Sequence, residues 1–256
     1  MTKQHAWEDV IDDEIRQIAS NYTGRMGQRN RPALVCIDNY NAVFGDRPEP
    51  VLDAMTRFPS SCGTAAWAAL EPTQRVMAAA RGAGIPVIHT TQDTFTEAHN
   101  STTVATKRVT YGADREWDHQ FFPALAPLPG ELVIRKTRAS AFYGTPLAAH
   151  LTQLEVNTLV FVGNSTSGCV RASVLEGFMH GYRVVVAEEC VFDRNWLSHK
   201  VNLFDMNCKY ADVLFLDQVL DYLERGQTDG GTPSAAARGD SRGSDAVRDN
   251  RLVMTP

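Results

Sequence analysis

Short runs of apolar residues alternate with helical patterns along most of the chain. The apolar runs cover residues 33–37, 85–89, 132–135, 159–162, 183–187 and 213–216, and helical patterns cover 72–84, 145–154, 169–180, 199–209 and 217–225. Strands that are apolar on both faces are typical of a parallel sheet buried between two layers of helices. With right-handed crossovers, the pattern predicts a three-layer α/β fold: a doubly wound parallel sheet of about six strands in the order 3-2-1-4-5-6.

The chain divides into three parts by composition. Residues 1–30 are expected to form an N-terminal helical arm, because apolar residues recur at helical spacing over 6–21. Residues 31–225 carry the alternating pattern and form the main domain. Residues 226–256 are rich in Gly, Ser, Asp and Arg, with little to bury, and are expected to be a disordered tail. Within the domain, the insertion over 45–70 is expected to form a lid or a subunit contact.

The totals argue against several classes of partner. The net charge is −5, which argues against a nucleic-acid or membrane-surface binder. No apolar run reaches the roughly 18 residues of a membrane span, and the first residues are polar and acidic, with no secretory signal. The five cysteines are dispersed and lack CxxC spacing. They predict reduced thiols, a cytoplasmic location and no zinc site.

Three reactive residues follow three of the predicted strands. Asp38 follows the first, Lys136 the third and Cys169 the fourth. In an open parallel sheet, ligands bind beyond the carboxyl ends of the strands, where the strand order reverses. Strands one and four flank that point in the predicted order. Asp38 and Cys169 are therefore expected to face each other across a crevice, with Lys136 nearby.

Each of these residues has a chemical reason to be there. A helix N-terminus stabilises a thiolate at Cys169, and its free N–H groups can hold an oxyanion. A carboxylate at Asp38 can take the thiol proton and return it to a leaving amine. Lys136 either keeps that carboxylate ionised or helps to hold charge on the thiolate. The alternatives are a small core cysteine, a solvated lysine and a capping aspartate. Spacing alone leaves both interpretations open.

Three motifs carry a resemblance to a known family. They are the strand that ends in Asp38, the run KTRASAFYGTPL from Lys136, and GNSTSGCVRAS from Gly163. Over roughly residues 30–220 the chain resembles the cysteine hydrolases of the isochorismatase-like superfamily. That resemblance implies an Asp38–Lys136–Cys169 catalytic triad. The segments 24–34, 189–194 and 199–213 are similar to the branch that contains N-carbamoylsarcosine amidase and maleamate amidohydrolase.

The resemblance also implies roles for residues around the triad. A cis peptide bond is expected between Asn164 and Ser165, and the backbone N–H groups of Ser165 and Cys169 are expected to form the oxyanion hole. Arg194 is expected to bind a substrate carboxylate, because its planar fork suits that group. A structural salt bridge with Asp193 or Glu189 is the alternative.

Further residues are expected to line the substrate pocket. Asn39 and Asn41 depart from the family's usual pattern after the first strand and are expected to alter substrate choice. Thr166 and Trp117 are the other expected substrate contacts, and 104–122 is expected to form the pocket rim. Neither His89 nor His99 fits the metal-binding Asp-x-His spacing of the nicotinamidase branch. No metal or cofactor is therefore expected, and His89 is expected to face the crevice from a strand end.

The resemblance implies an enzyme that cleaves a C–N bond of a small linear amide or ureido compound and releases ammonia. An N-carbamoyl amino acid such as N-carbamoylsarcosine is the preferred substrate, with maleamate and biuret as alternatives. A non-hydrolytic α/β protein that binds a ligand or senses thiol oxidation is the alternative of another class. The family also implies a homodimer or homotetramer, and the arm and 45–70 are the expected contacts.

Overall fold

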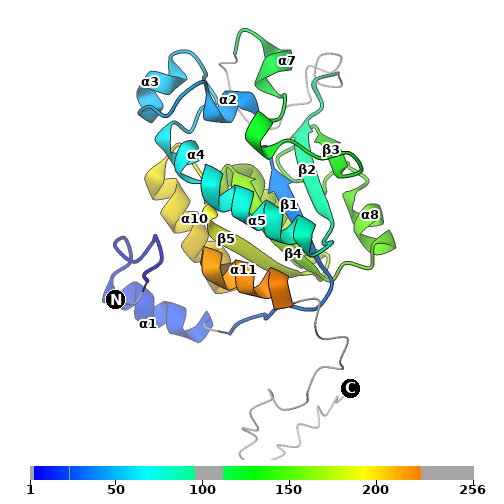
Figure 1. Ribbon diagram of the computed structural model, residues 1–256. Coiled ribbons are helices and arrows are strands. Elements are labelled where there is room, and N and C mark those ends of the chain that lie inside the picture. Colours follow the sequence, from blue (N-terminus) through cyan, green and yellow to red (C-terminus); the bar gives the residue numbers. More distant parts are fainter. Residues whose placement is uncertain (1–2, 23, 96–111, 226–256) are drawn as a thin grey trace, which may run out of the picture.

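One parallel sheet organises the computed structural model, which describes residues 3–22, 24–95 and 112–225. Its order is β3-β2-β1-β4-β5-β6, as predicted (Figure 1). The strands are β1 (Pro32–Ile37), β2 (Val87–Gln92), β3 (Leu132–Lys136), β4 (Thr158–Asn164), β5 (Arg183–Phe192) and β6 (Asp212–Leu214). All five neighbouring pairs are parallel. The order reverses between β1 and β4, so these two strands flank the predicted crevice.

Helices cover both faces of the sheet. On one face lie α5 (Leu70–Gly82) and α11 (Leu216–Arg225), and on the other α8 (Leu147–Gln153), α9 (Arg171–Met179) and α10 (Trp196–Lys209). Successive residues of β1 alternate between the two cores: Leu34 and Cys36 face α5, whereas Val35 and Ile37 face α9. Every residue of β1 is buried. A strand buried on both faces has no place for the polar alternation of a solvated sheet, which is why this run is wholly apolar.

Short helices lie above the carboxyl ends of the strands. They are α2 (Asn41–Phe44), α3 (Val51–Met55), α4 (Thr64–Ala68) and α7 (Arg115–Asp118), with the 3-10 turn η2 (Pro123–Leu125) beneath them (Figure 1). Aromatic rings join them: Phe44 stacks on Phe122 at 4.3 Å, and Phe58 contacts Trp117 at 5.3 Å between ring centroids. The 45–70 segment therefore forms a roof over the carboxyl edge of the sheet of its own chain, and its roles as a lid and in subunit contacts stay predictions.

The N-terminal arm differs from the single helix predicted over 6–21. Residues 6–10 form turns, and only α1 (Asp13–Ala19) is α-helical, followed by the 3-10 turn η1 (Ser20–Tyr22). No residue of α1 is buried. Asp12 caps α1 by accepting from the Ile15 amide at 2.8 Å, which starts the helix later than the apolar spacing suggested.

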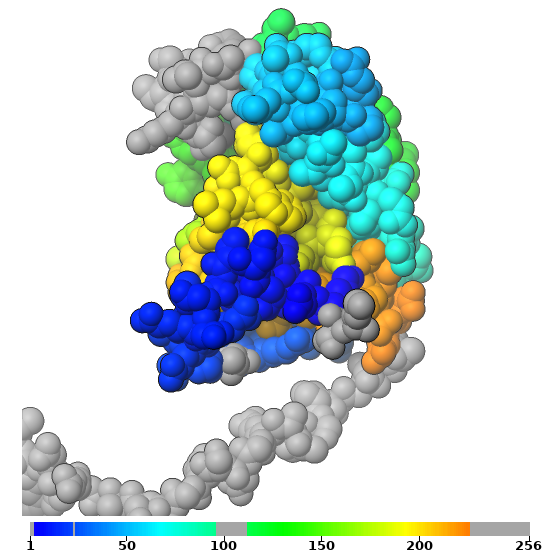
Figure 2. All heavy atoms as spheres, turned by 90° about the vertical axis from the view of Figure 1, so that its left-hand side faces the viewer, coloured from blue at the N-terminus to red at the C-terminus, as the bar shows by residue number. Residues whose placement is uncertain are grey.

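Trp7 is the anchor of the arm. Its ring is 3% exposed, stacks on His5 at 4.2 Å and lies 6.4 Å from the ring of Phe204 on α10. Figure 2 shows the arm, in dark blue, lying against the yellow atoms, with the orange atoms of α11 to one side. Asp9 adds an ion pair with Lys200 at 2.6 Å. The buried Trp7 ring and the ion pair between Asp9 and Lys200 therefore hold the arm against the main domain.

The structure corrects the prediction for His89 and leaves two others open. His89 does not face the crevice, because β2 continues to Gln92 and buries the imidazole against Glu131 at 2.9 Å.

The predicted tail over 226–256 and the rim residues 104–111 lie outside the described residues. Among the helices of the described ranges, none combines the length and apolarity that crossing a membrane requires.

Candidate active site

Asp38, Lys136 and Cys169 meet at the carboxyl edge of the sheet, as the sequence predicted. Lys136 Nζ lies 2.8 Å from Asp38 Oδ2 and donates to Cys169 Sγ at 3.4 Å. A third bond from Lys136 goes to the Arg138 carbonyl at 3.3 Å. The side chains of Asp38 and Lys136 are 2% and 1% exposed. A buried ion pair of this kind is costly to assemble for stability alone, so its place beside a thiol points to chemistry.

Backbone and hydroxyl contacts fix the position of Asp38. Its φ is +53°, in the left-handed region that a residue with a side chain seldom adopts. Thr90 holds it from β2: the Asp38 N–H donates to Thr90 Oγ1 at 3.1 Å, and that hydroxyl donates to Asp38 Oδ1 at 2.6 Å. Asn164 Nδ2 donates to the Asp38 carbonyl at 2.6 Å. The ends of β1, β2 and β4 are therefore tied together at the carboxylate.

A tight backbone approach brings β1 and β4 together at this point. Gly163 pairs with Ile37 and has a φ of +108°. A Cβ atom at Gly163 would lie 2.0 Å from the Ile37 carbonyl oxygen. Only glycine fits both the dihedral and the space, which explains why the small-residue turn starts with this residue.

The turn that carries Cys169 is not the start of a regular helix. The chain leaves β4 through a cis peptide bond between Asn164 and Ser165, as the resemblance implied. Thr166–Val170 then forms a π-helical turn, η3, and α9 begins only at Arg171. Gly168 has φ −114° and ψ −107° inside η3, which interrupts the helical path. The predicted helix start at Cys169 is therefore wrong by two residues, since this run of small residues has no apolar period to locate a helix start.

The charges of the site favour a protonated thiol before substrate binds. Burial raises the pKa of Cys169 to about 12; Lys136 opposes this rise and the Asp38 carboxylate adds to it. Burial acts to lower the pKa of Lys136, but the negative charge of Asp38 outweighs it and the pKa is raised. Lys136 is thus a permanent cation. Burial is the largest cause of the raised pKa of Cys169, so the thiol needs the base that the sequence expected at Asp38.

Arg194 follows β5 and bridges the turn to the roof. Its Nη1 donates to Ser165 Oγ at 3.3 Å, and its Nη2 donates to the Ser60 carbonyl at 2.8 Å. Its Nε is buried and has no hydrogen-bond partner. Within the described part of the chain, Arg194 makes no salt bridge, so the alternative of a pair with Asp193 or Glu189 is wrong.

Those two carboxylates have other partners. Asp193 accepts from the backbone N–H and the hydroxyl of Ser167 at 2.9 and 2.7 Å. Glu189 pairs with Lys3 of the arm and accepts from the Leu216 amide at 2.7 Å. The guanidinium therefore remains beside the nucleophile turn, with its buried Nε–H without a partner.

The four other predicted substrate contacts, Asn39, Asn41, Thr166 and Trp117, have different surroundings in the structure. Asn39, next to the triad, is 1% exposed, and neither of its amide atoms has a partner. Asn41 Nδ2 donates to the Trp117 carbonyl at 3.2 Å, so these two residues lie side by side in the roof. Thr166 is fully buried with its hydroxyl 2.8 Å from His199 Nδ1. The side chain is thus enclosed and its hydroxyl is engaged with His199.

Two nearby residues were missed from the sequence. Thr90 positions Asp38, and Gln92 lies at the end of β2 with a buried Nε2 that has no partner. Both belong to the run TTQ, which extends β2 three residues beyond the predicted end. The sequence did contain a signal for them, because these polar residues directly continue an apolar strand toward its carboxyl end. No cluster of metal-ligating side chains is found among residues 3–22, 24–95 and 112–225, and the metal-free site stays a prediction.

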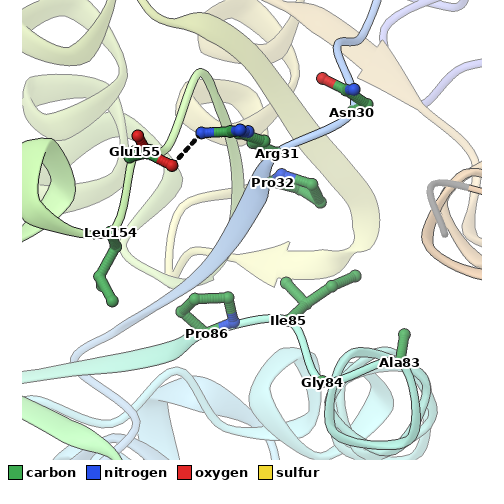
Figure 3. Close-up of a pocket in the computed structure, with 9 residues that line it drawn as sticks. All are labelled: Asn30, Arg31, Pro32, Ala83, Gly84, Ile85, Pro86, Leu154 and Glu155. Atoms are coloured by element: carbon green, nitrogen blue, oxygen red, sulfur yellow. Dashed lines mark hydrogen bonds and ion pairs between the residues drawn. The ribbon is translucent and has the colours of Figure 1, made fainter. Parts of the chain in front are cut away.

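A second hollow lies at the opposite edge of the sheet. Figure 3 shows it where β1 and β2 begin, with Pro32, Ile85 and Pro86 in its lining and an ion pair between Arg31 and Glu155. Its volume is about 300 Å³. Glu155 has a φ of +53° at the end of α8. Among the residues that line this hollow there is no nucleophile and no histidine, so the chemistry belongs to the carboxyl edge.

Comparison with known proteins gives a consistent result. The family described as "Isochorismatase domain" matches residues 32–218. Maleamate amidohydrolase of Pseudomonas putida is 35% identical over 217 residues, covering 82% of this chain and 97% of that protein. N-carbamoylsarcosine amidase of an Arthrobacter species is 34% identical over 209 residues, covering 78% and 74%. A solved isochorismatase family protein of Desulfovibrio vulgaris shares the fold, with a TM-score of 0.64, 24% identity, and 76% and 99% of the two chains covered.

Proposed function

Since this chain belongs to the isochorismatase family, we propose that it is a cysteine-dependent amidohydrolase. Its reaction is the cleavage of a C–N bond in a small linear amide or ureido compound. The observation that supports this most is the position of Lys136 Nζ, bonded to both Asp38 and Cys169 in a buried site. The relatives named as amidohydrolase and amidase support the same reaction class.

Acylation begins from the protonated thiol. Asp38 accepts the Cys169 proton as the sulfur attacks the carbonyl carbon, and Lys136 stabilises the thiolate as it forms. The backbone N–H groups of Ser165 and Cys169 hold the oxyanion in this proposal. Asp38 then gives its proton to the amine, the C–N bond breaks, and ammonia leaves an acyl-thioenzyme.

Deacylation uses the same carboxylate. Asp38 takes a proton from water as the water oxygen attacks the thioester carbon. The C–S bond breaks, and the proton passes from Asp38 to the Cys169 sulfur. With a ureido substrate the product is a carbamate, which loses carbon dioxide afterwards. A group that must be charged, then neutral, then charged again benefits from a fixed cation, which is the role of Lys136.

Arg194 supports a substrate that carries a carboxylate. Its guanidinium lies beside Ser165 and retains an unpaired, buried Nε–H. A carboxylate on the ligand would satisfy that donor, as bidentate Arg–carboxylate pairs do. N-carbamoylsarcosine or a related N-carbamoyl amino acid is the preferred substrate, and maleamate is the second candidate. Biuret lacks the carboxylate and would leave the Nε unpaired.

The test is ammonia release from N-carbamoylsarcosine, maleamate, biuret, ureidoacrylate and nicotinamide. The wild type is compared with Cys169→Ala and with Cys208→Ala, a matched change at a half-buried thiol on α10. Release from one compound, lost with Cys169→Ala and kept with Cys208→Ala, is the expected result. Release by Cys169→Ala at the wild-type rate, or from none of the compounds by a folded wild type, would overturn the proposal.

A thiol-sensing or ligand-binding protein is the second candidate function. It requires no ion pair beside the thiol, and a raised thiol pKa works against a reactive sensor cysteine. The Asp38–Lys136 pair therefore favours hydrolysis. We also propose a homodimer or homotetramer in the cytoplasm, on the family resemblance and on cysteines that are all free thiols in the described residues.

A further inference from the structure

Gln92 is a buried polar residue that the proposed reaction has not yet used. Its relative exposure is 6%, and its Nε2 has no hydrogen-bond partner. A buried amide N–H without a partner is costly to retain, and a ligand or water at that place removes the cost. The residue therefore has a donor left for a water or a ligand.

The register of the sheet places Gln92 beside the triad. Side chains of β2 alternate: Thr91 Oγ1 donates to the His119 carbonyl at 2.8 Å on one face, whereas Thr90 bonds to Asp38 on the other. Gln92 lies on the face of Thr90, one step closer to the carboxyl edge. It is also the register partner of Lys136 on β3.

The strands are still paired at this point. The Asp93 amide donates to the Lys136 carbonyl at 2.9 Å, so β2 and β3 have not yet separated. Neighbouring side chains on one face of such a pair lie about 5 Å apart. Gln92 is thus a same-face neighbour of Lys136, whose ammonium group binds both Asp38 and Cys169.

The free group is a donor, and this limits its partner. Lys136 offers no acceptor, and each oxygen of Asp38 already has a donor, Thr90 for Oδ1 and Lys136 for Oδ2. In the proposed function, the substrate carbonyl oxygen and the carboxylate lie on the other side of Cys169, toward Ser165 and Arg194. Among the acceptors that the reaction itself brings, this leaves the water that attacks the thioester.

We propose that Gln92 positions this hydrolytic water, an inference that rests on the proposed function. Gln92 Nε2–H donates to one lone pair of the water, and Asp38 accepts one of its protons. The second lone pair attacks the acyl carbon, the C–S bond breaks, and the proton on Asp38 passes to the Cys169 sulfur. Gln92 gains and loses nothing, so it is a positioning residue for deacylation only.

The test is pre-steady-state ammonia release by Gln92→Leu, which keeps the side-chain size and removes the donor. Ammonia leaves during acylation, so a variant slow only in deacylation shows a burst of one ammonia per site. The expected result is that burst, followed by a steady rate lowered on the order of tenfold, with an acyl adduct on Cys169 seen by mass spectrometry. Hydroxylamine, which attacks thioesters without this water, is expected to speed Gln92→Leu more than the wild type.

The control is Gln74→Leu, the same change at an exposed site on α5, which is expected to behave like the wild type. If Gln92→Leu slows the burst and the steady rate equally, or raises only KM, Gln92 contacts substrate or shapes the site and the inference falls. Thermal unfolding of both variants shows whether the fold is intact. The proposed function fails separately, if Cys169→Ala still releases ammonia in the same assay.

Discussion

The backbone at Gly163 passes so close to Ile37 that a Cβ atom there would lie 2.0 Å from the Ile37 carbonyl oxygen. Gly163→Ala must therefore move β4 away from β1 or distort the turn that carries Cys169. We expect a loss of at least about 3 kcal/mol of stability, together with a loss of turnover. Urea unfolding and an ammonia assay measure the two effects. Gly82→Ala, in α5 with nothing within 4 Å of its added Cβ, is the control and is expected to gain up to about 1 kcal/mol.

Asp38→Asn is expected to separate thiol reactivity from turnover. Burial and the Asp38 carboxylate raise the pKa of Cys169, and Lys136 acts to lower it. Removing the carboxylate charge leaves Lys136 unopposed, so the thiolate fraction at pH 8 rises. Iodoacetamide should label Cys169 faster in the variant, while turnover falls by at least about 100-fold because the proton carrier is lost. Slower labelling than in the wild type would contradict this account of the site's charges.

Arg194→Lys is expected to weaken substrate binding without changing the chemical step. A lysine cannot hold both the Ser165 hydroxyl and a carboxylate in one fork. For a carboxylate substrate we expect KM to rise about 10- to 100-fold with kcat kept. With biuret no rise is expected, and Arg171→Lys on α9 provides the matched control. A fall in kcat at unchanged KM would place Arg194 in the chemistry instead of in binding.

His199 predicts a loss of stability in acid. Burial lowers the pKa of His199 to about 4, with Asp193 and Glu188 opposing the shift. Because the folded value lies below the ordinary 6.5, its contribution is complete above pH 6.5 and is lost as the pH falls toward 4. The loss amounts to roughly 3 kcal/mol, at about 1.4 kcal/mol per pKa unit. Urea unfolding of the wild type and His199→Gln at pH 4.5 and 7.5 should show a smaller difference in the variant.

The remaining acid-sensitive groups are common to both proteins in that experiment. His89, whose pKa burial also lowers, is retained in each, so the difference isolates His199. His199 bonds Thr166 inside the nucleophile turn. An equal dependence on pH in the two proteins would show that His199 is already charged, or that the folded state does not bury it.

The sequence located the triad because each member follows a strand whose apolar run has a sharp end. Asp38, Lys136 and Cys169 needed only the strand order to be brought together, and that order follows from parallel strands with right-handed crossovers. The arm was harder to predict, because Ile15 and Ile18 have helical spacing but are exposed. The apolar spacing predicted that this whole face is buried, whereas Trp7 is the apolar residue of that face that is buried.

The directions of individual side chains could not be predicted from the order of residues either. Thr166 follows the cis bond in a turn without period, so nothing in its neighbours indicates that it faces His199. Gln92 was overlooked for a related reason: polar residues at a strand end look like the start of a loop. Register with Lys136 reveals its position, and register is a property of two strands.

Arg194 holds the roof through the carbonyl of Ser60 and not through its side chain. Any residue at position 60 supplies the same carbonyl, so the tether does not depend on the side chain there. Other positions of 45–70 are constrained, since Ala54, Cys62 and Ala66 are buried and a Cβ atom at Gly63 would lie 2.7 Å from the Glu49 carbonyl oxygen. The exposed residues of the segment can therefore change while the anchor and the nucleophile stay in place, and an engineer who wishes to change what this site accepts can begin with those positions.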